Sequence, residues 1–243
     1  MIRRRTSSHR TSALAAIVAG GVVLAACGGD DPTGLDLTGC LAEVDLFPVP
    51  VSNATSLFPF ADDGFLFVAF APGFQFEFYG TQYDGVFLNT NGGMTFGVGN
   101  SDYEEAADYF EEPSIAPFWT DLSAGETAES ELRANQMKYQ ACANGFVVRY
   151  NQLQDYDEEL LNNTATVTLE ANGKITFAYG AVLTDDLAVG VWDGTHTDDR
   201  YPALANDYSA YSTTGTGTIL FDYYGPGPVH AGELTNRTIT FSP

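Results

Sequence analysis

Acidic side chains are the most abundant groups in this sequence that could do chemistry. The 243 residues contain 32 Asp and Glu against 10 Lys and Arg, a formal net charge of −22. Calcium takes six to eight oxygen ligands from carboxylates, amides and carbonyls. Two acidic clusters contain candidate calcium ligands, Asp102 with Glu104 and Asp155 with Asp157. Neither has the spacing of an EF-hand loop, so a solvated acidic loop is the alternative for each.

An acid beside an aromatic ring is a second candidate site. Asp121 follows Trp119 by two positions, and an indole face can stack on a sugar. A glycosidase also needs a second acid across the sugar bond. The alternative is structural, with Trp119 in the core and Asp121 accepting backbone N–H groups in a turn. Trp119 and Asp121 are therefore kept as a candidate binding site.

Other catalytic patterns are missing from the sequence. Only His196 and His230 follow the first ten residues, and no G-x-S-x-G motif is present, which argues against a serine hydrolase. The sequence also lacks H-E-x-x-H, a P-loop and C-x-x-C. These patterns predict a protein that is not an enzyme.

The N-terminus predicts export. "MIRRRTSSHR" is basic, and the apolar run after it ends in "LAAC" at Cys27. This is the pattern of a secretory signal, and "LAAC" resembles the bacterial lipobox, whose cysteine carries lipid. We expect a lipoprotein signal peptide at 1–26, a lipid on Cys27 and a flexible acidic tether at 27–39. The expected location is the outer membrane or the cell surface. An ordinary signal peptide with an incidental cysteine is the alternative.

The remaining cysteines and the charge narrow the class further. With Cys27 lipidated, Cys40 and Cys142 form an even pair, which in an exported chain is read as one disulfide; two free buried thiols are the alternative.

Removal of the signal takes away four basic residues and no acid, so the charge moves from −22 to −26. Such a charge argues against nucleic-acid binding, which needs a basic surface.

Period-two patterns predict strands throughout the mature chain. Apolar and aromatic residues alternate around 74–78, 146–150, 165–169, 175–179, 189–191 and 239–241. Three Asn-Gly pairs lie between such runs and predict hairpins, with type I′ turns expected at 144–145 and 172–173. Two short segments, 101–110 and 125–135, have weak helical character without an extended apolar stripe. The expected fold is all-β, an antiparallel β-sandwich in a single domain at 40–243.

Several segments occur in an order that resembles a known family. "FEFYGTQYDGVFLNTNGGMTFG", "IAPFWTDL", "ATVTLEANGKITFAYG" and "VGVWDG" are similar to the NIDO domain, the extracellular module of nidogen, tectorin and membrane mucins. The resemblance covers about 120 residues and implies extracellular binding or adhesion without catalysis. The expected partners are the membrane, through the lipid, and an extracellular protein or glycan.

Two other functions stay open. One is a carbohydrate-binding or glycoside-cleaving module, and the other is a structural envelope protein without a small ligand. The segment "NTNGGMTFG" raises the same question locally, because Asn89, Asn91, Gly92 and Gly93 could form a ligand site or a tight hairpin. We predict the hairpin, with Asn91-Gly92 at positive φ and the Asn89 amide bonded to backbone of a neighbouring loop.

Overall fold

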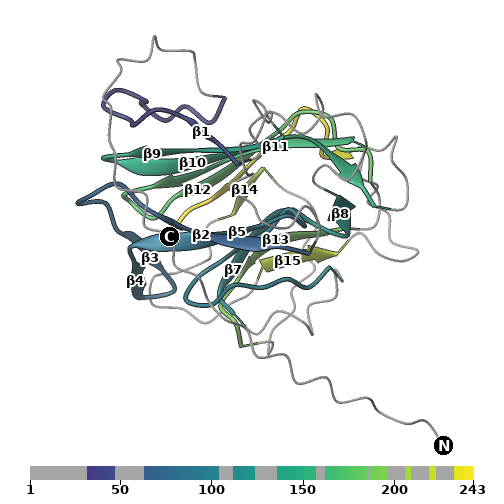
Figure 1. Cartoon of the computed structure of the whole chain (residues 1–243), viewed down its shortest axis with the longest axis horizontal. Coiled ribbons are helices and arrows are strands. Elements are labelled where there is room, and N and C mark those ends of the chain that lie inside the picture. The colour runs from purple at the N-terminus through teal and green to yellow at the C-terminus, as the bar shows by residue number, and fades with distance from the viewer. Residues whose placement is uncertain are drawn as a thin grey trace, which may run out of the picture.

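The computed structural model is all-β, with two stacked β-sheets (Figure 1). It describes residues 32–46, 63–103, 112–123, 136–156, 162–184, 187–195, 206–208, 219–222 and 233–243. No α-helix occurs in these ranges, and therefore no helix there is long and apolar enough to cross a membrane. The prediction of an all-β antiparallel sandwich is confirmed.

The larger sheet, sheet A, forms the upper layer in Figure 1. Its strand order is β1-β9-β10-β11-β12-β16-β14, and β8 also pairs with β10. All of its pairings are antiparallel except that of β14 with β16. The bounds of its strands are β1 Val44–Asp45, β8 Leu122–Ser123, β9 Met137–Cys142, β10 Gly145–Asp155, β11 Asn162–Glu170, β12 Ile175–Tyr179, β14 Asp207–Tyr208 and β16 Thr238–Phe241.

The second sheet, sheet B, forms the lower layer, and its strand order is β15-β13-β7-β6-β5-β2 (Figure 1). A separate short hairpin pairs β3 with β4. Their bounds are β2 Phe65–Ala69, β3 Phe76–Phe78, β4 Thr81–Tyr83, β5 Gly85–Asn89, β6 Met94–Thr95, β7 Ser114–Trp119, β13 Ala188–Trp192 and β15 Ile219–Asp222.

One hydrophobic core fills the space between the sheets. It takes one side chain in two from the paired strands of sheet A, as the period of a pleated strand requires. On β10 these are Phe146, Val148 and Tyr150, and on β12 they are Ile175 and Phe177. Fully burying each large apolar side chain is worth about 1.5–3 kcal/mol relative to leaving it exposed. The six alternating runs predicted from the sequence lie in β3 and the residues before it, β10, β11, β12, β13 and β16.

The three predicted hairpins are present, but the turn type expected for two of them is wrong. At β9–β10 the loop is Ala143-Asn144, neither residue has positive φ, and Gly145 is already paired in β10. At β11–β12 Gly173 alone has positive φ and closes a three-residue loop. A type I′ turn would need positive φ at both central residues, and the longer loop instead fits a type I turn followed by a left-handed glycine.

Some of the expectations fall outside the described residues. Cys27, Glu104 and Asp157 lie there, as do residues 1–31 and most of the two segments with helical character.

Candidate functional site

An N-terminal strap, residues 32–46, runs along the outer edge of sheet A. Its strand β1 pairs with β9, and Leu41 and Leu46 donate backbone hydrogen bonds to the carbonyls of Ala141 and Met137, at 2.8 and 3.0 Å. The disulfide expected between Cys40 and Cys142 is present and links the strap to the end of β9. The chain-entropy model assigns a loop of this length, with a sequence separation of 102, about 4–5 kcal/mol of stabilisation.

The strap also covers part of the outer face of sheet A. Leu35 packs on Cys142 and Val147, and the hydroxyl of Thr33 is hydrogen-bonded to that of Thr168. Leu35 and Thr33 lie within the segment 27–39, for which the sequence predicts a flexible acidic tether. Leu35 is its one buried residue in the described range 32–39, so contact with the sheet there is local.

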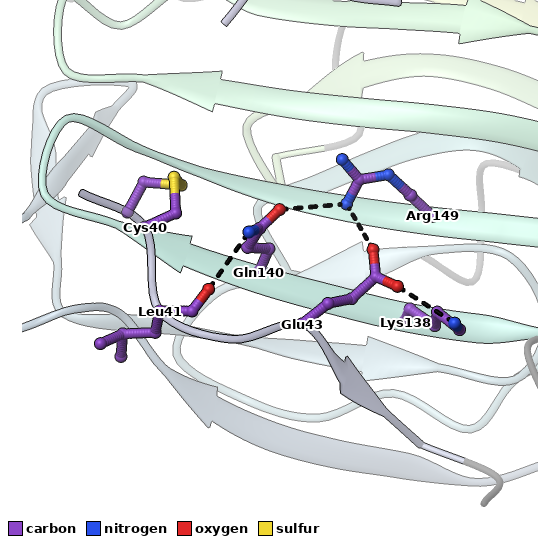
Figure 2. Close-up of polar contacts among 7 residues, drawn as sticks. Cys40, Leu41, Glu43, Lys138, Gln140 and Arg149 are labelled. Carbon is purple, nitrogen blue, oxygen red and sulfur yellow. Dashed lines mark hydrogen bonds and ion pairs between the residues drawn. A yellow bond between two sulfur atoms is a disulfide. The ribbon is translucent and has the colours of Figure 1, made fainter. Parts of the chain in front are cut away.

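A carboxylate from the strap lies between two cations of sheet A (Figure 2). Lys138 on β9 and Arg149 on β10 are directly opposite one another in the antiparallel pair. Like charges in that position repel. Glu43 accepts from both, at 3.1 Å from Lys138 Nζ and 2.9 Å from Arg149 Nη1. Because the three side chains are partly exposed, each ion pair contributes only about 0–1 kcal/mol.

Gln140 extends this network along β9 (Figure 2). Its amide nitrogen donates to the carbonyl of Leu41 at 3.1 Å, and its amide oxygen accepts from Arg149 at 3.5 Å. The strap is thus joined to sheet A by a disulfide, backbone hydrogen bonds and side-chain contacts, and these fix the direction of the Arg149 guanidinium.

A shallow depression of about 380 Å³ opens beside this network, and we call it the polar depression. The described part of the chain contains only four basic residues, and two of them line this one place. A guanidinium, an ammonium and threonine hydroxyls offer hydrogen-bond donors to a carboxylate, a sulfate or a sugar. Its lining residues are Glu43, Lys138, Arg149, Tyr150, Asn151, Thr164 and Thr166.

Sequence reasoning missed this site, although one signal was available. Cys142 pairs with Gly145 across the β9–β10 turn. Counting four residues back and four forward from this pair places Lys138 opposite Arg149. The position of Glu43 could not be found in this way, because the strap reaches it through the long disulfide loop.

The Asn-Gly segment is a buried scaffold hairpin, as predicted. Thr90 bonds through its backbone and hydroxyl to Gly64. Asn91, 1% exposed, donates to Asp63 Oδ1 and to the carbonyl of Asp102 and accepts from the Leu122 N–H, at 3.0, 3.2 and 3.2 Å. The hairpin is therefore hydrogen-bonded to three other segments of the chain, at 63–64, 102 and 122.

Asn89 differs from the prediction. Its amide oxygen accepts from the backbone N–H of Gly93 at 2.7 Å, within its own hairpin rather than from a neighbouring loop. Its amide nitrogen is buried without a hydrogen-bond partner. Only Gly92, with φ of +80°, has positive φ in this turn; Asn91 does not. The loop is again three residues long, as at Gly173, and this explains the difference.

Trp119 and Asp121 lie in different environments. Trp119 is fully buried, packs near Trp192 and donates from Nε1 to the Asp102 carbonyl at 3.1 Å. A fully buried indole offers no face for a sugar, so the role predicted for Trp119 does not fit its position. Asp121 is partly exposed, and its carbonyl accepts from the N–H of Tyr156 at 3.0 Å.

Two residues of the predicted calcium clusters, Asp102 and Asp155, lie in the described ranges, and hydrogen bonds are formed by the backbone of the first and the side chain of the second. The carbonyl of Asp102 accepts from Trp119 and Asn91, and the Asp155 carboxylate accepts from the hydroxyl of Thr184 at 3.0 Å. Within the described ranges no group of three or more His, Cys, Asp or Glu could hold a metal ion. Their partners, Glu104 and Asp157, lie outside those ranges.

The fold and the disulfide together define the class of protein: an all-β sandwich whose N-terminal strap is joined to the larger sheet by a disulfide. The family model described as NIDO related matches residues 46–243. The chain therefore belongs to the NIDO-related family, and the predicted resemblance is confirmed. Neither the curated proteins nor the solved structures that were compared contain a match.

Proposed function

We propose that this chain is an exported, lipid-anchored module that binds a surface ligand without chemical turnover. The NIDO-related family suggests an extracellular module. The Cys40–Cys142 disulfide supports the same compartment, because disulfides persist mainly in oxidising environments. The stretch "LAAC" supports a lipid on Cys27.

The ligand surface in this proposal is the polar depression. The observation that carries it is the meeting of Lys138 and Arg149 in a chain of net charge −22. With Glu43 paired to both cations, the three side chains keep one net positive charge. An acidic protein repels anions over most of its surface, so a place of net positive charge can select an anionic group. The ligand class is a glycan or protein segment that carries a carboxylate or a sulfate. The disulfide and hydrogen bonds that join the strap to sheet A would hold the site in place before the ligand arrives, which lowers the cost of binding.

The anchor and the ligand are tested separately. Labelled palmitate should enter the wild-type protein and not Cys27→Ser, and Cys27→Ser should leave the membrane fraction. A wild-type protein that never takes up palmitate would remove the anchor from the proposal.

Binding to arrays of glycans and matrix proteins, with and without calcium, tests the ligand surface. Equal binding by wild type and Arg149→Ala would remove the depression from it.

A further inference from the structure

Strand β2, Phe65–Ala69, is the last strand of sheet B on one side. Among the strands of the described ranges it pairs with β5 alone, through its inner edge. An open edge presents unpaired N–H and C=O groups, and proteins usually blunt such edges with charges, prolines or bulges. Residues 64–76 contain no charged side chain, Pro72 lies beyond the strand, and the register of β2 with β5 has no shift that would mark a bulge.

The hydrogen-bond pattern shows which backbone groups of β2 point outward. The N–H of Thr90 donates to the Gly64 carbonyl, and that of Phe70 donates to the Asp84 carbonyl. Bonded and non-bonded pairs alternate along an antiparallel ladder. Leu66 and Val68 therefore bond to β5. Phe65, Phe67 and Ala69 direct their N–H and C=O groups to the open edge.

An aromatic surface lies along the same edge. The rings of Phe67 and Phe65 lie 5.1 and 5.8 Å from that of Phe87, centroid to centroid, and we call these three residues the edge patch. Phe67 is 47% exposed. Its ring covers Gly85, where a β-carbon would come within 2.4 Å of it, so the ring lies flat along the sheet.

We propose that the open edge of β2 pairs with β2 of a second copy, in antiparallel register about Phe67. This register puts Phe67 opposite its own copy and Phe65 opposite Ala69. All three residues then exchange both backbone bonds with the residues opposite them. The contact is isologous, with the same surface used twice, as a two-fold axis requires. It joins the two B sheets into one and the two edge patches into one apolar surface.

Charge explains why two such acidic chains could meet here. At a net charge of −22 the molecules repel one another. The proposed contact places no carboxylate opposite another, because Asp63 would lie opposite Ala71. Repulsion between the rest of the two molecules is screened within about 8–10 Å at physiological salt. The association should therefore strengthen as salt rises, whereas a dimer held by ion pairs would weaken.

The first test is sedimentation velocity of the purified protein carrying Cys27→Ser, over a series of protein and salt concentrations. One short strand gives a small interface, so a weak, concentration-dependent dimer is expected. Phe67→Lys should weaken it by at least about tenfold, a loss of 1.4 kcal/mol or more. Leu183→Lys is the matched control, since Leu183 is 46% exposed and its N–H donates to Asn163 of sheet A, and it should dimerise as the parent does. A monomer at every concentration, or equal dimers in both variants, would overturn the proposal.

Amide hydrogen exchange tests the register without any substitution in β2. The amides of Leu66 and Val68 should be protected at all concentrations, because they bond to β5. Those of Phe65, Phe67 and Ala69 should exchange fast in dilute protein and slow down as the dimer forms. A dimer in which these three amides stay unprotected would show that another surface mediates it. Neither test depends on the lipid anchor or on a ligand of the polar depression.

Discussion

A β-carbon on Gly92 would lie 2.2 Å from the backbone oxygen of Phe118 and 2.6 Å from its ring. The β5–β6 turn therefore touches strand β7 directly, and only glycine leaves room for this contact. The turn thus packs against another strand of the same sheet, sheet B. This contact supports the interpretation of the turn as part of the scaffold.

Gly92→Ala should destabilise the fold more than Gly97→Ala. Both glycines have similar positive φ, +80° and +83°, so the strain from an L-residue is matched. A β-carbon on Gly97 meets nothing within 4 Å. We expect about 1 kcal/mol of lost unfolding free energy at Gly97 from strain alone. At Gly92 the contact with Phe118 adds about 1–3 kcal/mol of overpacking. Urea unfolding of both variants measures the difference, and equal losses would show that the turn is not packed as described.

Asn89→Ala should lower the unfolding free energy by about 1–3 kcal/mol, because the buried N–H of Gly93 loses its acceptor. Asn172→Ala is the control: the same residue type accepts a hydrogen bond from the Lys174 N–H at an exposed turn. Water can replace that bond, so its loss should cost no more than about 0.5 kcal/mol. If Asn89→Ala melts as the wild type does, the hairpin-scaffold reading fails.

Reduction of the Cys40–Cys142 disulfide should lower the melting temperature clearly. A disulfide in a small exported domain typically contributes 2–5 kcal/mol. The double variant Cys40→Ser, Cys142→Ser should melt at the temperature of the reduced wild type and should not respond to reductant. Mass spectrometry of unreduced peptides provides the direct check, and two alkylatable thiols in the native exported protein would contradict the linkage.

The sequence predicts the strands well for a physical reason. A strand with one buried face must alternate, and the runs at 146–150 and 175–179 do so because their apolar residues fill the core. The turn types were harder to predict, because an Asn-Gly pair fits both a two-residue loop and a three-residue loop. The register of the two strands decides between these loops. Gly145 is already paired with Cys142, whereas Gly173 still lies within the loop between Glu170 and Lys174.

Only part of the polar depression could have been predicted from the sequence, namely the Lys138–Arg149 pair. The β9–β10 hairpin is local, so the pairing of Lys138 with Arg149 follows from the turn. Glu43 arrives from a strap that is distant in sequence, and nothing near Glu43 in the sequence marks its partners. The sugar-binding role predicted for Trp119 did not fit for a related reason. An aromatic residue near an acid gives the same sequence pattern whether the ring lies on the surface or, as here, in the interior.

The most direct test of the proposed function compares array binding by three proteins: wild type, Arg149→Ala and Lys174→Ala. Both substitutions remove one positive charge and one ion pair with glutamate. Only Arg149 lines the polar depression. We predict that wild type and Lys174→Ala bind the same acidic glycan or protein, and that Arg149→Ala binds it at least about tenfold more weakly with an unchanged melting temperature. Equal binding by all three proteins, or no binding to any acidic ligand, would contradict the proposal.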